Sequence, residues 1–307
     1  MNRAKVILLA IGLDLLIGEP DARWHPVVWM GRLVGRLAQA APGEGAWRQF
    51  SYGAVTEAVC LAAAAIPAWL AERLLPRGVA GLLAAALLLK PVFAIRALFQ
   101  HARPVEKALE EGNLPEAREA VGRIVSRDVT ALDEAGVAAA AVESLAENAS
   151  DSVVAPLLCY ALFGLPGTYL YRMANTLDAM LGYRGRYEYL GKAAARVDDF
   201  LNVAPSRLTA LAMVVASRIA GGSPTGAWRT ALRDSSRTAS PNSGWPMAAA
   251  AGALGLRLEK RGHYVLNPDG WPPRGGDVAR ARRVVTASLV VAVLGILLVS
   301  GRQKRDD

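Results

Sequence analysis

The sequence predicts an all-α, polytopic integral membrane protein with about four transmembrane helices, additional re-entrant or buried helices and a polar cytoplasmic face. Hydrophobic residues make up 53% of the 307 residues, and charged residues make up only 20%. The charges are unevenly placed, because apolar runs of membrane length alternate with charged stretches. Membrane insertion explains this alternation better than one soluble core does, so we treat residues 1–307 as a single membrane-embedded domain.

Six apolar segments mark the expected helices, at residues 4–17, 53–75, 78–100, 153–170, 203–221 and 284–300. A helix needs about 20 mostly apolar residues to cross the hydrocarbon core, with about 17 as the lower limit. The second, third and sixth segments approach this length. The first is shorter, but it lacks a small-residue cleavage site, so we expect it to be retained. Asp14 within it must face a partner or a wet cavity, or reach the interface from a helix end.

The fourth and fifth apolar segments are interrupted. Pro156 and the break GLPG at 164–167 lie in the fourth, and Arg207 and Arg218 lie in the fifth. These residues are unfavourable in a simple lipid-facing helix. We therefore expect re-entrant or protein-buried helices here, which leaves four spans.

Three polar stretches separate the apolar segments, at residues 101–152, 171–202 and 222–283. All three carry candidate chemistry and should share one compartment, so we place them at the cytoplasmic face of the inner cell membrane. The first should form amphipathic helices with breaks near residues 112–115 and 126–128. The third should form ordered loops around a short helix at 246–256.

The net charge of +8 does not indicate a nucleic-acid partner. Residues 101–152 hold 5 Lys or Arg against 11 Asp or Glu, which leaves 30 against 16 for the rest of the chain. That basic excess flanks apolar runs, as the positive-inside rule expects of cytoplasmic loops. The lipid bilayer and anionic substrates explain it more simply.

Several enzyme classes lack support in the sequence. The two cysteines and three histidines are too scattered for a metal site, so we expect no permanently bound transition metal. Walker A, nucleophile-elbow and dinucleotide-binding glycine motifs are all missing from the sequence. P-loop, hydrolase and Rossmann interpretations therefore have no support.

A group of acids in the first polar stretch has helical spacing. Glu143, Glu147 and Asp151 follow at four-residue steps, and Asn148 lies beside them. On a helix such like charges cost about a few tenths of a kcal/mol per pair unless a cation or donors offset them. Magnesium carried by a nucleotide would do so. A solvated acidic face is the competing interpretation.

The second polar stretch combines acids, amides and arginines. Asn175 and Asp178 are three residues apart, as are Asp199 and Asn202, so each pair can point one way from its helix. The surrounding basic residues are Arg172, Arg184, Arg186, Lys192, Arg196 and Arg207. Carboxylates for magnesium and guanidinium groups for phosphate suit a site for ATP and anionic substrates. A structural ion-pair network is the alternative.

Long motifs along almost the whole chain resemble the adenosylcobinamide-phosphate synthase family, the membrane-bound cobalamin biosynthesis proteins called CbiB or CobD. The motifs are DLLIGEPDARWHPVVWMG at 14–31, VSRD at 125–128, ESLAENASDSVVAPL at 143–157, YRMANTLDAMLGYR at 171–184, AARVDDFLNVAPSRLTAL at 194–211 and SPNSGWPMAAAAGALGLRL at 240–258. Several long motifs in the right order are more specific than one short pattern. The part after Gly270 is less diagnostic.

The resemblance implies an ATP-dependent acid–amine ligase. It would join the carboxylate of a corrinoid substrate, adenosylcobyric acid, to the amine of aminopropanol or aminopropanol phosphate. At neutral pH an acid and an amine form a salt rather than an amide. ATP can activate the carboxylate as an acyl phosphate, which the neutral amine then attacks. This route needs magnesium ligands, cations around the phosphoryl group and a base.

On this basis we assign roles to residues by their chemistry. The magnesium ligands would be Asp178 with Asp198 or Asp199. The phosphate contacts would be Arg127, Arg172 and Arg186. The orienting amides would be Asn148, Asn175 and Asn202, and the base would be His25 or Asp151. Further substrate-binding candidates are Ser126, Asp128, Glu147, Tyr183, Arg207, Asn242 and Ser243. The N-terminal motif adds Asp14, Glu19, Asp21 and Pro26.

Two other functional classes stay open. A polytopic transporter would also show an intramembrane acid and broken helices, but it favours repeated halves and polar residues near the midplane of several spans. A magnesium-dependent membrane phosphotransferase could use Asp198 and Asp199, although it would want a denser aspartate signature. A homo-oligomer and a complex with other cobalamin-assembly enzymes both stay open, as do phosphorylation of the amine and adenosylation of the corrinoid.

Overall fold

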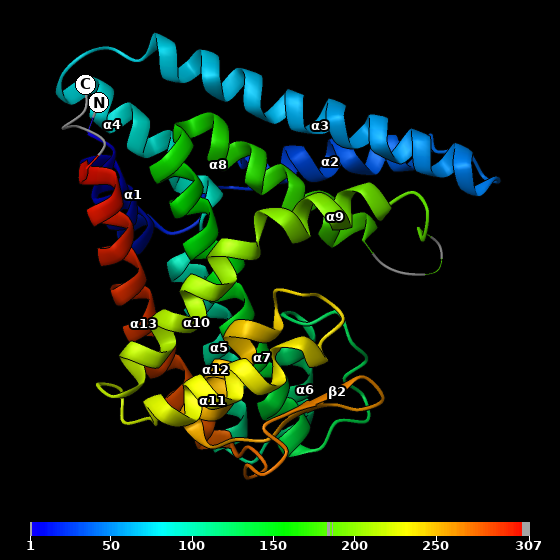
Figure 1. The fold of residues 1–307 in the computed structure, drawn as a ribbon, viewed down its shortest axis with the longest axis vertical. Coiled ribbons are helices and arrows are strands. Elements are labelled where there is room, and N and C mark those ends of the chain that lie inside the picture. Colours follow the sequence, from blue (N-terminus) through cyan, green and yellow to red (C-terminus); the bar gives the residue numbers. More distant parts are fainter. Residues whose placement is uncertain (1, 183–184, 186, 303–307) are drawn as a thin grey trace. The chain divides into compact units, whose positions relative to one another are not determined.

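The structure is a computed structural model that describes residues 2–182, 185 and 187–302. The described residues are mostly helical (Figure 1). The first helices are α1 (Arg3–Ile17), α2 (Pro26–Gln39), α3 (Ala46–Leu74), α4 (Val79–Leu89), α5 (Ile95–Glu110), α6 (Leu114–Gly122) and α7 (Glu134–Ala149). The later helices are α8 (Ala155–Leu181), α9 (Lys192–Leu201), α10 (Val203–Ser217), α11 (Pro224–Asp234), α12 (Gly244–Leu254) and α13 (Gly275–Arg302).

Short elements complete the fold. Two are 3₁₀ turns, η1 (Lys90–Val92) and η3 (Ser235–Arg237), and η2 (Ser150–Val154) is a π-helix between α7 and α8. Strands β1 (Leu258–Lys260) and β2 (Tyr264–Leu266) pair antiparallel. The all-α prediction therefore needs one correction: Gly262, at φ 75°, closes a hairpin where we expected loops.

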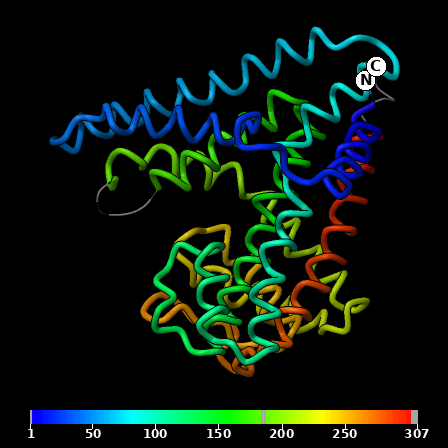
Figure 2. The backbone as a smooth tube through the Cα atoms, turned by 180° about the vertical axis from the view of Figure 1, so that it is seen from behind, coloured from blue at the N-terminus to red at the C-terminus, as the bar shows by residue number. Residues whose placement is uncertain are grey.

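The chain divides into two compact units, each made of separate chain segments. Unit 1 comprises residues 1–94, 155–202 and 296–307, and unit 2 comprises residues 95–154 and 203–295. In unit 1, α2 and α3 run side by side, as Figure 2 shows in blue from behind. Helix α3 also packs against α8 and α9, and α1 packs against α4.

Helix α8 is broken inside unit 1. At Gly164 the backbone has φ 74° and ψ −159°, so two helical parts meet there, with Pro166 opening the second. A side chain at Gly164 would collide with the carboxylate of Glu72, since a Cβ there would lie 2.5 Å from its oxygens. The interruption expected at 164–167 is confirmed.

Unit 2 packs around α12, whose residues are almost all buried and mostly alanine or glycine. Helices α7, α10 and α11 contact it. At Gly252 a Cβ would lie 2.2 Å from the carbonyl oxygen of Gly226 on α11, so glycine lets the two helices meet closely. Helix α11 itself was not anticipated, although Ser223 caps it and Pro224 begins it, a recognisable start signal.

Four helical runs are long and apolar enough to cross a membrane by length and composition: Ala46–Leu74, Val79–Glu110, Glu134–Leu181 and Gly275–Gly301. Helices α9 and α10 qualify only together, as a bent pair. The expected count agrees, but its membership needs correction. The first apolar segment forms α1 of only 15 residues, which is too short, and the run containing the fourth segment qualifies.

The interrupted segments still differ from simple spans. In the run Glu134–Leu181, 61% of the most apolar window is buried, against 44% or less in the other three. Burial on this scale agrees with the expectation of a protein-covered fourth segment. The α9–α10 pair is bent by 46°, as in a broken span or a re-entrant loop.

Candidate functional site

Unit 1 holds a buried carboxylate at Asp198. Helix α9 turns this side chain inward, where it is 8% exposed. The amide groups of Asn202 and Asn175 donate to its two oxygens at 2.9 and 3.4 Å. Tyr171 donates its hydroxyl hydrogen to Asn202 Oδ1 at 2.9 Å. The structure thus brings two of the predicted site residues, Asn175 and Asn202, together around a third, Asp198.

A second buried acid faces the same place from α3. Glu57 is 5% exposed, and neither of its carboxylate oxygens has a hydrogen-bond partner among the described residues. Its electrostatic neighbours are Asp198 and Asp178. One turn earlier, Gly53 lets α3 approach closely, since a Cβ there would lie 2.0 Å from the carbonyl oxygen of Leu190. We call Glu57, Asp178 and Asp198 the acidic cluster.

The acidic cluster has one open side. Asp178 is partly exposed, as is its electrostatic neighbour Asp199. Among the described residues, no group of three or more His, Cys, Asp or Glu side chains could hold a metal ion. Magnesium often binds through only one or two carboxylates and takes phosphates and waters as its other ligands, so the oxygen donors here still suit it.

The arginines predicted near this cluster are only partly described. Arg172 donates to Asn175 Oδ1 at 3.4 Å, so its guanidinium group lies beside the amides that bind Asp198. Tyr183 and Arg186 lie outside the described residues, as does Arg184.

A separate ion-pair network joins the N-terminal motif to the end of α4. Lys90 Nζ lies 3.4 Å from Asp14 Oδ1 and 3.1 Å from Glu19 Oε1. Asp14 is fully buried and Lys90 is 7% exposed. An acid inside an apolar helix requires a partner. For Asp14 that partner is a lysine from another apolar segment.

His25 fixes the start of α2. The Val27 backbone N–H donates to His25 Nδ1 at 3.2 Å, so the ring proton lies on Nε2, which donates to Glu19 Oε2 at 2.8 Å. Burial raises the pKa of Glu19, but the hydrogen bond from His25 and the charge of Lys90 outweigh it and lower the pKa. Both ring nitrogens of His25 are engaged in this arrangement.

The remaining residues of the N-terminal motif shape the backbone. Asp21 accepts from the Arg23 backbone N–H at 2.9 Å, and Pro26 is the first residue of α2. Pro26 also lines an apolar cavity of about 480 Å³, together with Trp24, Trp29, Met30, Leu33 and residues of α3, α4 and α8.

Unit 2 holds a buried ion pair between Arg127 and Glu143. Glu143 is 1% exposed on α7. Tyr264, from the β-hairpin, lies near this pair; its burial and the charge of Glu143 raise the pKa of Tyr264. The cation that offsets this acid is thus Arg127, and the solvated-face interpretation is wrong for Glu143.

The acids after Glu143 lie on two helical elements. Glu147 keeps the α-helical step and acts electrostatically on Tyr264, so it faces the same side as Glu143. Asp151 lies past the end of α7, in the π-helix η2. Asn148 donates to the Ser144 carbonyl oxygen at 3.0 Å and accepts from Ser152. One face for all three acids, as expected from the sequence, therefore stays a prediction for Asp151.

The loop before α7 contains an aspartate turn. Asp128 Oδ1 accepts from the backbone N–H and the hydroxyl group of Thr130, and these two bonds lower the pKa of Asp128. Ser126 is exposed beside it. The break expected near 126–128 is therefore a turn that Asp128 stabilises.

Arg207 connects α10 to the segment before α12. It donates to Asn242 Oδ1 at 2.6 Å, and its guanidinium carbon lies 5.0 Å from the centre of the Trp245 ring. Asn242 is 4% exposed, and Ser243 is half-buried beside it. The predicted residues Arg207, Asn242 and Ser243 therefore form one local group in unit 2.

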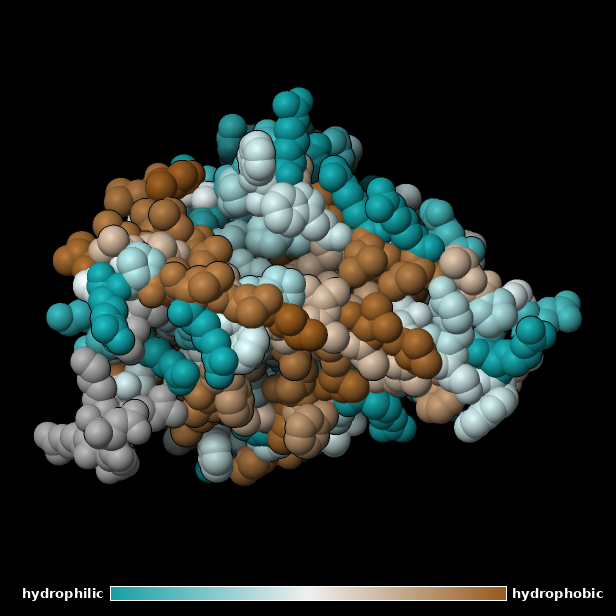
Figure 3. All heavy atoms as spheres, turned by 90° about the horizontal axis from the view of Figure 1, so that it is seen from above, coloured by the Kyte–Doolittle hydropathy of each residue, from teal (hydrophilic) through white to brown (hydrophobic). Residues whose placement is uncertain are grey.

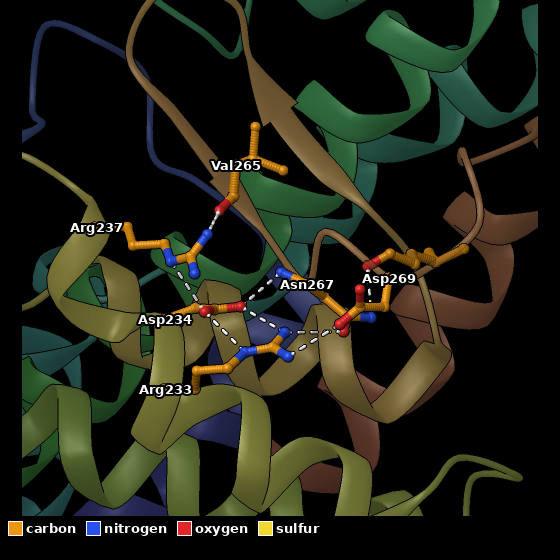
Figure 4. A network of polar contacts seen from close by, with 7 residues as sticks. Arg233, Asp234, Arg237, Val265, Asn267 and Asp269 are labelled. Carbon is orange, nitrogen blue, oxygen red and sulfur yellow. Dashed lines mark hydrogen bonds and ion pairs between the residues drawn. The ribbon is translucent and has the colours of Figure 1, made fainter.

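A third polar network in unit 2 ties α11 to the hairpin (Figure 4). Asp234 is fully buried and receives Arg233 at 2.9 Å, Arg237 at 3.0 Å and the Asn267 backbone N–H at 2.7 Å. Arg233 also pairs with Asp269 at 3.1 Å. The hydrogen bond to Asp234 raises the pKa of Arg233. This network positions the hairpin, which carries Tyr264.

Sequence reasoning missed four buried charged residues of the described chain, Glu57, Lys90, Asp234 and Asp277. For the first two a signal was present, since each is a charged residue inside an apolar segment of near-membrane length. That signal was used for Asp14 but not for its partner. Asp234 lies in an arginine-rich segment and carries no such signal.

Comparisons with known proteins agree with this arrangement of motifs. The family model described as CobD/Cbib protein matches residues 7–291. The chain belongs to this family. A cobalamin biosynthesis protein CobD of Dehalococcoides mccartyi is 42% identical over 266 residues, which is 86% of each chain. A CobD protein of Chromobacterium violaceum is 44% identical over 302 residues, or 94% of each chain.

The family extends to archaea. A probable cobalamin biosynthesis protein CobD of Methanothermobacter thermautotrophicus is 42% identical over 302 residues, which is 98% of each chain. No solved structure matches the chain. The geometry of this CobD/Cbib member therefore has to be interpreted from its own side chains.

Proposed function

We propose that the chain acts in cobalamin biosynthesis as an ATP-dependent acid–amine ligase. It would join the corrinoid carboxylate of adenosylcobyric acid to aminopropanol or its phosphate. Membership of the CobD/Cbib family supports the pathway. The observation that carries the reaction type is the acidic cluster of unit 1, where buried carboxylates and amides gather beside an arginine.

The acidic cluster suits the nucleotide end of this reaction. In the proposal Asp178, with Asp198 or Asp199, would hold magnesium that arrives with ATP, and the ion would supply positive charge to the phosphate oxygens. Asn175 and Asn202 orient Asp198 through their amide hydrogens. Arg172 supplies a cation beside them for a phosphate oxygen.

The polar groups of unit 2 suit anionic substrate groups. Arg207 stacks one face of its guanidinium group on Trp245 while it donates to Asn242. The same group can also donate to an anionic oxygen. Arg127 is 14% exposed at its side chain and pairs with Glu143. A phosphate contact by Arg127 would therefore add to an existing buried pair.

The proton acceptor in the proposal is Asp151 or His25. His25 would have to release a hydrogen bond at one ring nitrogen before it could accept a proton, since Nδ1 accepts from Val27 and Nε2 donates to Glu19. Asp151 lies on the π-helix, an element often found at functional sites.

Exposed apolar side chains support an inner-membrane location. On α3 the exposed ones include Val55, Val59, Ile66 and Leu70. Figure 3, a view from above, shows broad hydrophobic areas on the surface of the molecule. Trp47 and Trp69 lie near the two ends of α3, 22 residues or about 33 Å apart, close to the thickness of a hydrocarbon core. Aromatic residues at both interfaces are typical of spanning helices.

One experiment tests the proposed reaction. The purified protein is incubated with adenosylcobyric acid, MgATP and either aminopropanol or aminopropanol phosphate, and the corrinoid product is identified by mass. We expect an amide product only when ATP, magnesium and an amine are all present. Product formation without ATP, or no product with either amine, would contradict the proposal.

A further inference from the structure

The acidic cluster contains more negative charge than the proposed metal site needs. Glu57, Asp178 and Asp198 act on one another electrostatically, and the charged neighbours of Glu57 among the described residues are carboxylates. Asp198 receives two amide donors, whereas Glu57 receives none from the described residues. A carboxylate 5% exposed and without a donor is expensive to bury as an anion, so a ligand that supplies donors would stabilise it.

The missing ligand is not explained by a metal bound to all three acids. Among the described residues no three acidic, His or Cys side chains are placed to hold a metal ion. Magnesium needs oxygen atoms at about 2.0–2.1 Å, whereas an ammonium nitrogen lies about 2.7–2.9 Å from each acceptor. A primary ammonium also carries three donors and no acceptor, which matches a set of groups that can only accept.

The surroundings of Glu57 suit a small organic cation. One turn further along α3 lies the fully buried Cys60, and Ala64 follows. These residues belong to an apolar core with Leu177 and Leu190. A short hydrocarbon chain could rest against such side chains while its ammonium group meets the carboxylates.

We propose that Glu57, together with Asp198, binds the primary ammonium group of the amine substrate. This inference rests on the proposed function, since that function supplies an amine. Asp178, on the open side, would remain with the metal and nucleotide. Glu57 thereby holds the reacting nitrogen at the buried end of the site and selects amines over neutral alcohols of the same shape.

The test compares Glu57→Gln with Glu72→Gln, the same substitution elsewhere on α3. Binding of 1-amino-2-propanol is measured by calorimetry on the purified protein, with 1,2-propanediol as the neutral analogue. Losing the buried charge should weaken amine binding, and raise the KM for the amine, by about 30-fold or more. Mn²⁺ binding, measured by paramagnetic resonance, and the KM for MgATP should stay unchanged. Glu72→Gln should bind the amine as the unaltered protein does.

Two results would overturn the inference. One is equal amine affinity in the unaltered protein and Glu57→Gln. The other is loss of Mn²⁺ binding in Glu57→Gln with an unchanged KM for the amine, which would make Glu57 a metal ligand. If Glu57→Gln does not fold, Glu57→Asp keeps the charge but shortens the side chain, and a raised KM for the amine is then expected. Glu57-dependent amine binding without any amide product would leave this site standing and contradict only the ligase reaction.

Discussion

Three charged side chains inside apolar segments have different charged neighbours in this fold. Asp14 and Lys90 neutralise each other, and Lys90 also reaches Glu19. Among the described residues, the charged neighbours of Glu57 are other carboxylates. A buried charge with a partner contributes to structure, whereas one without a partner indicates a ligand site.

Lys90 should be required for stability. Lys90→Met leaves Asp14 fully buried without its cation, so the free energy of unfolding should fall by about 3 kcal/mol or more. Chemical unfolding in detergent measures it. The double variant Lys90→Met with Asp14→Asn should recover part of the loss, because the unpaired charge is removed. Equal stability of Lys90→Met and the unaltered protein would show that the ion pair is not structural.

The two aspartates of the acidic cluster should respond differently to removal of their charge. The Asp178 carboxylate receives no hydrogen bond from the described residues, so Asp178→Asn should keep normal abundance while turnover falls by about 100-fold or more, as expected for a lost metal contact. Asp198→Asn places an amide against the donors of Asn175 and Asn202, so it should also lose about 1–3 kcal/mol of stability. Turnover and thermal unfolding of both variants are measured. Normal activity of Asp178→Asn would remove it from the site.

At the scale of elements, the boundary between α7 and α8 and the path of α3 position the polar groups. The π-helix η2 lies between two α-helices and carries Asp151. Helix α3 reaches the acidic cluster because Gly53 allows contact with the backbone of Leu190. The π-helix and the glycine are both local features of the backbone, and each helps to place a polar side chain.

Glu147 should separate activity from stability. In a ligand site, Glu147→Gln removes a contact while also removing repulsion from Glu143, so activity should fall while stability stays level or rises slightly. Glu143→Gln is the matched comparison, and it should lower stability because Arg127 loses its buried partner. Turnover and thermal unfolding are measured for both, and for Asp151→Asn. Full activity of Glu147→Gln and Asp151→Asn would return these two residues to a solvated face.

Close approach of α3 should depend on Gly53. Gly53→Ala would place a Cβ 2.0 Å from the carbonyl oxygen of Leu190, so α3 must shift, and stability should fall by about 1–3 kcal/mol. Gly12→Ala on α1 is the control, since no atom lies within 4 Å of its Cβ position and alanine favours the helix. Thermal unfolding compares them. If the two variants are equally stable, the close contact at Gly53 does not constrain α3.

At the scale of the whole molecule, the three polar stretches must reach soluble substrates. Stretches 101–152 and 222–283 lie in unit 2, and 171–202 lies in unit 1. Parts of both units are therefore expected to face the cytoplasm.

All three polar stretches should be accessible from the cytoplasm. In a chain with Cys60 and Cys159 replaced by alanine, single cysteines at the exposed positions Glu111, Glu188 and Arg261 are labelled with a membrane-impermeant maleimide. We expect labelling only after the inner membrane is opened, since the substrates are cytoplasmic in the proposed function. Labelling of any one position from the periplasmic side would contradict the single-face arrangement.

The sequence by itself determined the helical class, the apolar segments, the breaks near 112–115 and 164–167 and the family motifs, because hydropathy, glycine and proline act locally. Only the tertiary structure decided which charged residues meet. Lys90 pairs with Asp14 across 76 residues of sequence, and Glu57 joins Asp198 from another helix. No periodicity encodes such distant pairs, since they arise from helix packing. The same packing decided that Glu143 is neutralised by Arg127, which its own helical spacing could not reveal.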